Sequence, residues 1–424
     1  MNKSKAGLYF AVIVAALGYF VDLYDIVIFG VVRVASLKSL GLEGQAITDW
    51  AVNLFNIQMG GMVIGGVVWG LVADRFGRRL ALFATIAMYS LANIANAYVT
   101  TVEQYAVMRF LAGFGLAGEL GIGVTLVSEA LDIRKRGYGT TIIAFLGLVG
   151  ALTAAFVGKN FEWHTAYLVG GGMGLLVLAG RFLGVEESQI FEGKAAPKQV
   201  RDVAVLLRPD LLLKLAAVIA LGVPIWFVST MFVTYSPEVG KALGLTEPLN
   251  VGIVLKWQAT GLAIGAALTG LVSEYLGSRK FVLMGCFVGM SLMLAVLLNL
   301  HGLTSAAYGI AMLCMGLMQG YWTPFVTLAA EQFGTNVRAT VATSVPNFVR
   351  FIGTLLAGWT LTHAASLPLM AGAVGAAILL LAFAGLVPLE ETYGRDLDYR
   401  EPMTAAEARR LVQERRAARV AAGR

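Results

Sequence analysis

The chain has 424 residues, of which 58% are apolar and only 14% are charged, and its mean hydropathy is +0.75. A soluble protein of this length needs more charge to cover its surface, so the composition excludes an ordinary soluble globular protein. The formal net charge is +6. Its cations lie mainly in short connections between apolar runs, which argues against a nucleic-acid-binding protein.

The sequence contains no cluster typical of a metal, nucleotide or covalent-catalysis site. The two cysteines, Cys286 and Cys314, both lie in apolar stretches, and the three histidines are scattered. A Walker-type nucleotide loop and a Ser-His-Asp grouping are also absent from the sequence. We therefore expect no enzyme activity, no metal, no cofactor and no ATP-driven transport.

Apolar runs of roughly 20 residues recur along the chain, and each is long enough to cross about 30 Å of hydrocarbon. The first run follows Lys3 and Lys5 like a signal peptide, but it has no clear small-residue cleavage site and is interpreted as a span. The sequence therefore predicts an all-α protein with twelve transmembrane helices in a lipid bilayer. The expected spans are 8–33, 53–72, 80–99, 104–127, 138–158, 165–184, 211–235, 250–272, 280–299, 304–328, 340–363 and 367–388.

Basic residues mark one side of this topology. Connections after even-numbered spans hold clusters of arginine and lysine, whereas those after odd-numbered spans hold few cations. The positive-inside rule then places the even-numbered connections and both termini in the cytoplasm, with the protein in the cell inner membrane. The expected parts are a six-helix bundle at 1–184, a cytoplasmic linker at 185–210, a second six-helix bundle at 211–390 and a basic cytoplasmic tail at 391–424.

Two stretches of the chain repeat at a nearly constant spacing. Residues 61–79 align without gaps with 261–279, at an offset of 200, and the two share glycines at four positions. A second match, of Glu129 with Glu331, follows at an offset of 202. These matches indicate a duplicated six-helix unit, whose halves can rock about a site between them and so give alternating access.

Ionisable groups inside hydrocarbon are costly, so each one within a span is a candidate functional residue. The first span carries Asp22, Asp25 and Arg33 on one polar face. In the fourth span Arg109 lies near the depth of the two acids, which predicts an ion pair that serves either proton coupling or packing alone. Glu119 has no cation within a turn of its own helix. We expect it to carry a proton; the alternative is a carboxyl group hydrogen-bonded to backbone.

The second half contributes cations without acidic neighbours in their own spans, namely Arg350 in the eleventh span and Lys256 in the eighth. A substrate carboxylate or phosphate can supply the missing counter-ion of Arg350 by bidentate hydrogen bonding. A cross-helix pair with an acid of the first half is the alternative. The expected substrate-binding residues are Arg350, Lys256, Arg33, Asn347, Gln319, Trp322 and Tyr24.

The loop Gly70-Leu71-Val72-Ala73-Asp74-Arg75-Phe76-Gly77-Arg78-Arg79 resembles the signature loop of the major facilitator superfamily. The stretch from Arg109 through Glu119 to Gly137 is similar to the metabolite:proton symporters and their sialate and phosphate symporter relatives. The resemblance covers the whole chain and departs from the family pattern at Ala117 and Gly334. It implies the major facilitator fold and gating contacts at the cytoplasmic helix ends. The implied gating residues are Gly70, Asp74, Arg75, Gly77, Arg78, Glu129, Arg136, Glu331 and Arg338.

We therefore expect a secondary active transporter that moves a small anionic metabolite, such as an organic acid, by proton symport and alternating access. Its partners would be the anion, protons and the lipid bilayer, and the chain is expected to act as a monomer. The expected proton-coupling residues are Asp22, Asp25, Glu119 and Arg109. Two alternatives stay open: a proton-coupled exporter of cationic or amphipathic drugs, and a transporter-like receptor that does not translocate.

Overall fold

The computed structural model describes residues 5–119, 136–184, 205–299, 301–302, 304–394 and 401. Within these ranges the secondary structure is helical without strands, and each of the twelve expected spans contains a helix, which confirms the predicted all-α class. The helices of the first half are α1 (Lys5–Ser39), α2 (Gln45–Phe76), α3 (Arg78–Asn96), α4 (Val102–Leu116), α6 (Arg136–Asn160) and α7 (Trp163–Gly184). Those of the second half are η2 (Val205–Leu207), α10 (Pro209–Ser229), η3 (Thr230–Thr234), α11 (Ser236–Ala242), α12 (Val251–Leu276), α13 (Arg279–Leu298), α14 (Ser305–Gln319), α15 (Trp322–Glu331), α16 (Thr335–His363) and α17 (Leu367–Gly385).

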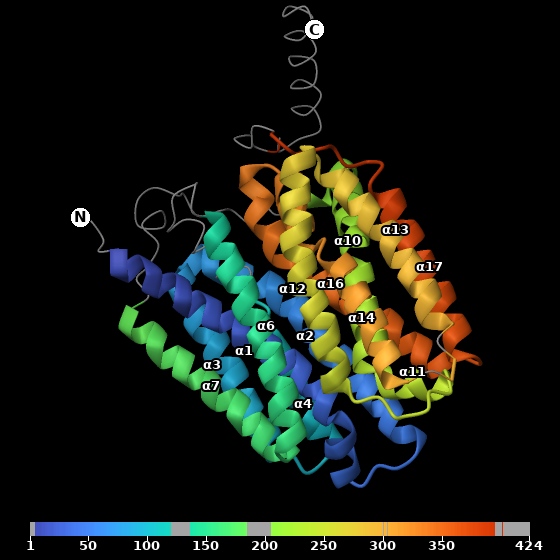
Figure 1. Ribbon diagram of the computed structural model, residues 1–424. Coiled ribbons are helices and arrows are strands. Elements are labelled where there is room, and N and C mark those ends of the chain that lie inside the picture. The colour runs from blue at the N-terminus through green and yellow to red at the C-terminus, as the bar shows by residue number, and fades with distance from the viewer. Residues whose placement is uncertain are drawn as a thin grey trace, which may run out of the picture.

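The two halves form helical bundles that lie side by side, the first coloured blue to green and the second yellow-green to red (Figure 1). Each bundle has an apolar core of its own. Leu54 and Ile86 belong to the first core, Phe287 and Met312 to the second, and all four are 0% exposed. Residues 185–204, within the expected linker, lie outside the described residues, as does the expected tail beyond 401.

Repeated glycines let equivalent helix pairs approach closely in both bundles. A Cβ atom on Gly61 or Gly65 of α2 would collide with the backbone of α4. Gly261 and Gly265 of α12 face the backbone of α14 in the same way. Because glycine alone lacks a Cβ, these positions allow close backbone packing that any other residue would prevent. The duplicated sequence thus builds a duplicated pair of closely packed helices.

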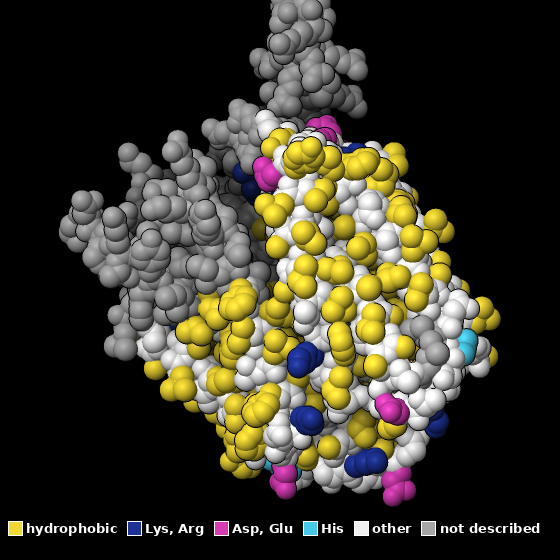
Figure 2. Space-filling view, in the orientation of Figure 1, with side chains coloured by type: hydrophobic (Ala, Val, Ile, Leu, Met, Phe, Trp, Pro, Cys, Tyr) yellow, Lys and Arg dark blue, Asp and Glu magenta, His cyan; other side chains and the backbone are white. Residues whose placement is uncertain are grey.

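The outer surface is suited to a lipid environment. Six helices of the described part are long and apolar enough to cross a membrane, namely α2, α7, α10 with η3, α12, α13 and α17. Large apolar side chains point outward from the bundles, among them Leu176 at 74% exposure, Leu292 at 62% and Leu380 at 69%. Apolar side chains are spread over the visible face of the molecule (Figure 2). Soluble monomers rarely expose contiguous apolar surface of this extent, so the surface agrees with the predicted membrane spans.

Two spans of the second half are interrupted, and one of the interruptions, η3, contacts α1 of the first bundle. Beyond Pro224, α10 changes at Thr230 into the π-helical segment η3, and α14 ends at Gln319 before α15 begins at Trp322. Single π-helical turns and broken transmembrane helices commonly occur at functional sites, because they release backbone carbonyl groups for other partners.

The bundles meet along two helix pairs, α2 with α16 and α6 with α12. Gly358 of α16 lies against Val52 of α2, and Gly252 of α12 lies against Ala155 of α6. Between these pairs, α1 of the first bundle faces η3 and α12 of the second. Asp22 and Arg33 of α1 reach across this interface to partners in the second half.

Candidate functional site

Three side chains of the first bundle form a buried charged cluster. Arg109 Nη1 of α4 lies 3.3 Å from Asp25 Oδ1 of α1, and both residues are 0% exposed. Gln58 of α2 donates to the other carboxylate oxygen of Asp25 at 2.6 Å and accepts a hydrogen bond from Arg109. The Arg109 guanidinium also lies 4.9 Å from the ring centre of Phe29. Of the two acids that the sequence offered as partners of Arg109, the structure selects Asp25.

A second ion pair crosses from one bundle to the other. Arg350 Nη2 of α16 donates to Asp22 Oδ2 of α1 at 3.1 Å, and the two residues are 1% and 0% exposed. The guanidinium lies over the indole ring of Trp226, 5.2 Å from its centre. The sequence left open whether Arg350 pairs with a substrate or with an acid of the first half. In this structure Arg350 pairs with Asp22 and also has a hydrogen bond with the side chain of Tyr19.

Glu119 has a cationic partner from another helix, although none lies within a turn of its own. Arg181 near the end of α7 donates to both carboxylate oxygens of Glu119, at 2.6 and 3.1 Å, and Thr85 of α3 donates to it at 2.7 Å. Glu119 is 2% exposed and Arg181 is 1% exposed. The sequence reasoning considered only cations within a turn of the same helix, whereas the partner comes from a different helix of the same bundle.

Arg33 lies near the C-terminal end of α1 and connects the two bundles. Its Nη2 donates to the Glu238 carboxylate of α11 at 2.7 and 2.8 Å and to the backbone carbonyl of Thr234 at 3.1 Å. The ring centre of Tyr235 lies 5.1 Å from the guanidinium. Thr234 is the last residue of the π-helical segment η3. Because Arg33 already has these partners in the second bundle, its position does not support the substrate-binding role predicted for it.

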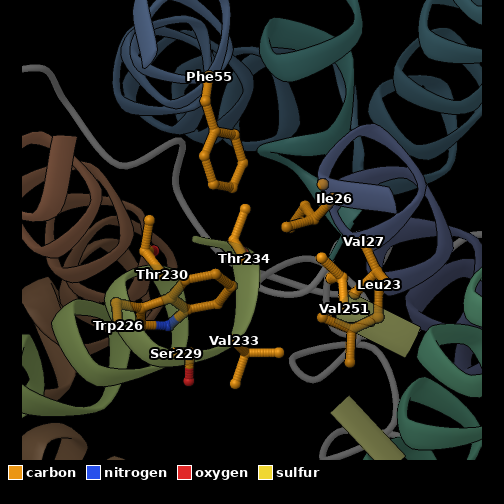
Figure 3. Close-up of a pocket in the computed structure, with 11 residues that line it drawn as sticks. Leu23, Ile26, Val27, Phe55, Trp226, Ser229, Thr230, Val233, Thr234 and Val251 are labelled. Atoms are coloured by element: carbon orange, nitrogen blue, oxygen red, sulfur yellow. The ribbon is translucent and has the colours of Figure 1, made fainter. Parts of the chain in front are cut away.

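A cavity that is partly open to solvent lies between the bundles (Figure 3). Its lining on α1 runs from Leu23 to Gly30, and therefore lies between Asp22 and Arg33, which are about 16 Å apart along the helix axis. The rings of Phe55 and Trp226 form two of its walls, and the Ser229 and Thr230 hydroxyls supply polar groups. The cavity thus lies between the two ion pairs that connect the bundles.

An uncharged polar cluster lies behind the cavity wall in the second bundle. Gln258 of α12 donates to Gln319 Oε1 of α14 and to Ser229 Oγ, both at 2.7 Å. Gln319 in turn donates to the backbone carbonyl of Ile225 at 3.0 Å. Ser229 lines the cavity whereas Gln319 does not. Gln319, which the sequence predicted to bind substrate, therefore lies behind Ser229 and can position it.

The remaining predicted substrate-binding residues lie outside the cavity lining. The hydroxyl of Tyr24 donates at 2.8 Å to a backbone carbonyl of α7 inside the first bundle. Lys256 is exposed on α12, and Trp322 packs half-buried against the second core. Asn347 is buried and donates to the backbone carbonyl of Ala117 at 3.2 Å, so it joins the two bundles. These positions do not support direct substrate contact for Tyr24, Lys256 or Trp322.

The loop that resembles the family signature turns at Gly77. Gly77 has φ 96°, a backbone conformation that glycine alone adopts without steric cost. Arg75 is exposed and its guanidinium lies 5.3 Å from the ring centre of Phe76, while Gly70 borders open space. Four other residues implied by the resemblance fall outside what the structure describes: the side chains of Asp74, Arg78 and Arg136, and the whole of Glu129.

The matching gating residues of the second half join neighbouring helix ends. Glu331 at the end of α15 pairs with Arg279 at the start of α13, with 2.9 Å between Oε2 and Nε. Arg338 of α16 donates from Nε to the backbone carbonyls of Ala330 and Phe333, at 3.1 Å each. These contacts hold the ends of α13, α15 and α16 together, and a gating role for them stays a prediction.

The described interior contains four arginine–carboxylate ion pairs, and two of them connect the bundles. They are Arg33–Glu238, Arg109–Asp25, Arg181–Glu119 and Arg350–Asp22. Among the residues described, no three His, Cys, Asp or Glu side chains gather in a way that could hold a metal ion. Arg181, Gln58 and Glu238 were not singled out from the sequence. Arg181 could have been found by the rule that selected Asp22, because it too is a charge within an apolar span.

Comparisons with known proteins agree with this architecture. Residues 9–358 match the family model of the Major Facilitator Superfamily. The niacin transporter NiaP of Acinetobacter baylyi is 37% identical over 162 residues, which make up 37% of this chain and 36% of that protein. The 3-(3-hydroxy-phenyl)propionate transporter of Escherichia coli is 28% identical over 344 residues, or 76% of this chain and 82% of that protein. The chain thus spans little more than a third of the niacin transporter and most of the second relative.

A solved structure shows the same fold. The xylose transporter XylE from Escherichia coli, in a partially occluded inward open conformation, superimposes with a TM-score of 0.71. The match covers 93% of this chain and 100% of that one at 16% sequence identity. This confirms the fold predicted from the sequence. Both relatives named above are transporters, in agreement with the expectation that the chain is not an enzyme.

Proposed function

Because the chain belongs to the Major Facilitator Superfamily, we propose that it is a secondary active transporter that carries an aromatic carboxylic acid together with a proton. The relatives named for niacin and for 3-(3-hydroxyphenyl)propionate support this class, since each compound joins an aromatic ring to a carboxylate. The observation that carries the proposal is the buried Arg350, whose guanidinium lies over Trp226 at a cavity between the two bundles.

The cavity has the composition that an aromatic acid requires. The rings of Phe55 and Trp226, with the aliphatic side chains of Leu23 and Val27, provide apolar walls for an aromatic ring. Arg350 is outside the cavity lining, but its guanidinium lies 5.2 Å from the ring centre of Trp226, which lines the cavity. A carboxylate that reaches Arg350 past this ring can bind it with charge-assisted hydrogen bonds. Apolar walls with a single cation nearby favour an aromatic carboxylate over a sugar, which needs many hydrogen-bond partners.

The transport cycle would use the two bundles as rigid bodies that rock about the cavity. Breaking the Arg33–Glu238 pair would open the cavity at one end. Breaking contacts such as Asn347 with the Ala117 carbonyl would open it at the other. With the orientation derived from the positive-inside rule, the Arg33 end is the outer one and both termini are cytoplasmic. The protein would work as a monomer in the cell inner membrane.

The acids of α1 would provide the coupling to protons, and the drug-export alternative finds no support in their surroundings. A site for a cationic drug needs a carboxylate that is free to pair with it. Asp22 and Asp25 both face arginines, and so does Glu119. The support for an anionic substrate comes instead from Arg350, which is joined to Asp22 by a single hydrogen bond.

The test is uptake into proteoliposomes that contain the purified protein. Radiolabelled 3-(3-hydroxyphenyl)propionate and nicotinate are added outside vesicles with an alkaline interior, and protein-free vesicles give the passive entry to be subtracted. The wild type is expected to accumulate at least one of the two acids, and an uncoupler to abolish the accumulation. Arg350→Gln should reduce uptake at least about tenfold, because a charge-assisted hydrogen bond contributes about 1.5–3 kcal/mol.

Lys256→Gln is the matched control. It removes a cation that the sequence also predicted to bind substrate, but one that the structure places on the surface, and it should transport like the wild type. Uptake that survives in Arg350→Gln, or that is lost in Lys256→Gln, would contradict the proposed anion site. Accumulation of neither acid would contradict the proposed substrate class.

A further inference from the structure

We propose that the substrate carboxylate replaces Asp22 as the partner of Arg350, and that the displaced Asp22 takes up the proton that is carried with the substrate. This inference rests on the proposed function, since it assumes a carboxylate that enters the cavity. It assigns the coupling to the exchange of one carboxylate for another on a single arginine.

The contact between Asp22 and Arg350 is incomplete. One hydrogen bond of 3.1 Å, from Nη2 to Oδ2, joins the two side chains. In the part of the chain that the structure describes, neither Asp22 Oδ1 nor Arg350 Nε has a hydrogen-bond partner. A guanidinium can hold a carboxylate through two parallel hydrogen bonds. An incoming carboxylate that uses both Nε and Nη2 would therefore bind Arg350 better than Asp22 does.

Two other acids that are fully buried within the described spans, Asp25 and Glu119, are held more completely, and each is held within one bundle. Asp25 receives Gln58 at 2.6 Å in addition to Arg109. Glu119 receives two hydrogen bonds from Arg181 and one from Thr85. A rocking motion of the bundles leaves contacts inside a bundle unchanged. Asp22 is thus the buried acid whose partner lies across the moving interface and can be exchanged.

Charge balance then requires the proton. When a substrate carboxylate occupies Arg350, Asp22 would remain as an unpaired charge at 0% exposure, and an unpaired buried ion costs several kcal/mol. Forming an O–H bond on Asp22 removes this charge. The proton comes from the water that admits the substrate, and it returns to water on the opposite side when Asp22 pairs with Arg350 again.

The charged and titratable groups around Asp22 favour this assignment. Arg350 faces it from α16, and the first bundle surrounds it with groups that are acidic or become anionic. These are Asp25 and Tyr19 on α1, Glu119 beyond α4 and Tyr89 of α3. Asp25 and Glu119 are already paired with Arg109 and Arg181, and the tyrosines are uncharged near pH 7. Once Arg350 is engaged by the substrate, no unpaired cation among the described groups around Asp22 is left to stabilise its charged form.

The exchange also explains why neither ligand would be carried alone. A substrate without a proton leaves Asp22 charged and unpaired, and a proton without a substrate leaves Arg350 charged and unpaired. Both states are penalised by burial, whereas the doubly loaded and the empty states are each neutral at this pair. The two ligands therefore bind cooperatively, as reciprocal linkage requires.

The experiment is isothermal titration of the purified full-length protein with 3-(3-hydroxyphenyl)propionate and with nicotinate near pH 7. Titrations in two buffers of different ionisation enthalpy give the number of protons taken up per ligand. The wild type should take up about one proton, and its affinity should fall by up to about tenfold for each unit of pH increase. Asp22→Asn should bind at least as tightly as the wild type, with about zero protons and no pH dependence.

Glu238→Gln is the matched control, because it also turns the carboxylate of a cross-bundle ion pair into an amide. It lies beyond the cavity at Arg33, so it should keep the uptake of about one proton. Uptake of one proton by Asp22→Asn would overturn the inference. Loss of the uptake in Asp25→Asn with retention in Asp22→Asn would overturn it as well, by moving the proton to the Arg109 pair.

If Asp22→Asn does not fold, a measurement on the wild type tests whether a carboxyl group takes up the proton. Infrared difference spectra recorded on ligand addition should show a new protonated carboxyl band, and Asp22→Glu, which keeps the charge, should shift that band. A spectrum without the band would overturn the inference while the proposed function stands. Failure of the wild type to bind either acid would instead contradict the proposed function, and this inference would fall with it.

Discussion

Two polar clusters at equivalent positions of the duplicated unit show how the halves differ. Gln58 and Gln258 lie 200 residues apart. The backbone carbonyl of each lies against a glycine of the neighbouring helix, Gly113 for Gln58 and Gly316 for Gln258. Gln58 binds two ions, Asp25 and Arg109, whereas Gln258 binds only uncharged groups.

The two halves share the packing of these helices but differ in the chemistry of the side chains at the same points. The backbone contacts that bring α2 to α4 and α12 to α14 have been kept in both halves. The side chains at the same points have diverged into an ion pair in the first bundle and an amide cluster in the second. We interpret the first bundle as the part that responds to protons, and the second as the part that supplies a wall and a cation for the substrate.

The largest change in the free energy of unfolding is expected at the charged cluster of Asp25, Arg109 and Gln58. Arg109→Gln leaves Asp25 as an unpaired buried carboxylate, so it should lower the free energy of unfolding by about 3–5 kcal/mol. The double variant Asp25→Asn/Arg109→Gln turns this cluster into an uncharged one like that of the second half, and should recover most of the loss. Denaturant unfolding in detergent micelles measures both. A double variant no more stable than Arg109→Gln would show that charge is not the difference between the clusters.

The shared packing predicts equal effects in the two halves. A Cβ on Gly113 or on Gly316 would meet the carbonyl oxygen of the facing glutamine. Gly113→Ala and Gly316→Ala should each lower the free energy of unfolding by about 1–3 kcal/mol, the usual cost of overpacking. The same unfolding measurement compares them. A clearly larger loss in one bundle would break the equivalence of the two helix pairs.

A smaller effect is expected at the uncharged cluster. Gln319→Leu removes the hydrogen bonds to Gln258 and to the Ile225 carbonyl. The cost should be about 1 kcal/mol, since hydrogen bonds between membrane helices contribute little beyond that. Thermal unfolding without 3-(3-hydroxyphenyl)propionate would measure the loss of stability, and its shift on adding this compound would measure any change in ligand binding. A loss as large as that of Arg109→Gln would contradict the distinction between the two clusters.

The smallest change in stability is expected at a contact of the second bundle that lies outside the membrane spans. Glu391, after α17, accepts hydrogen bonds from the Ser278 hydroxyl at 2.6 Å and from the backbone N–H groups of Arg279 and Lys280 at 3.1 Å each. Burial acts to raise the pKa of Glu391, but these hydrogen bonds outweigh it and hold the pKa below its usual 4.5. A depressed pKa means that the folded state favours the ionised carboxylate.

The stabilisation by Glu391 is therefore present above pH 4.5 and is lost as the pH falls through the lower pKa of the folded state. Glu391→Gln should be less stable than the wild type at pH 7, by about 1 kcal/mol or less because the group is largely exposed. The difference should disappear as the pH drops below 4.5. Thermal unfolding over this pH range is the measurement, and a difference that stays the same below pH 4.5 would contradict this role of Glu391.

The spans and the depth of buried charges could be predicted from the sequence. Apolar runs set the helices, and counting residues from one face placed Arg109 level with Asp25, which it contacts. The repeated glycines indicated the duplication that the two bundles show. These inferences depend on length and spacing alone, which a linear sequence contains.

The partners across helices could not be predicted, because spacing gives no information on which helices are neighbours or how each is rotated. The search around Glu119 therefore covered only its own helix, and it missed Arg181, which α7 brings to Glu119. Lys256 was expected at the site, but the rotation of α12 leaves it exposed. Tyr24 lies between two site acids in the sequence, yet its side chain points into the first bundle.

The four buried ion pairs have a consequence for the energy source of transport. In the part of the interior that the structure describes, each of these four arginines is matched by one carboxylate, so the pairs carry no net charge through the membrane. If one substrate anion enters with one proton, the loaded interior is neutral as well. Moving an elementary charge through 100 mV involves about 2.3 kcal/mol, but here no charge would move. The transporter would then be electroneutral, driven by the pH gradient and insensitive to the membrane potential.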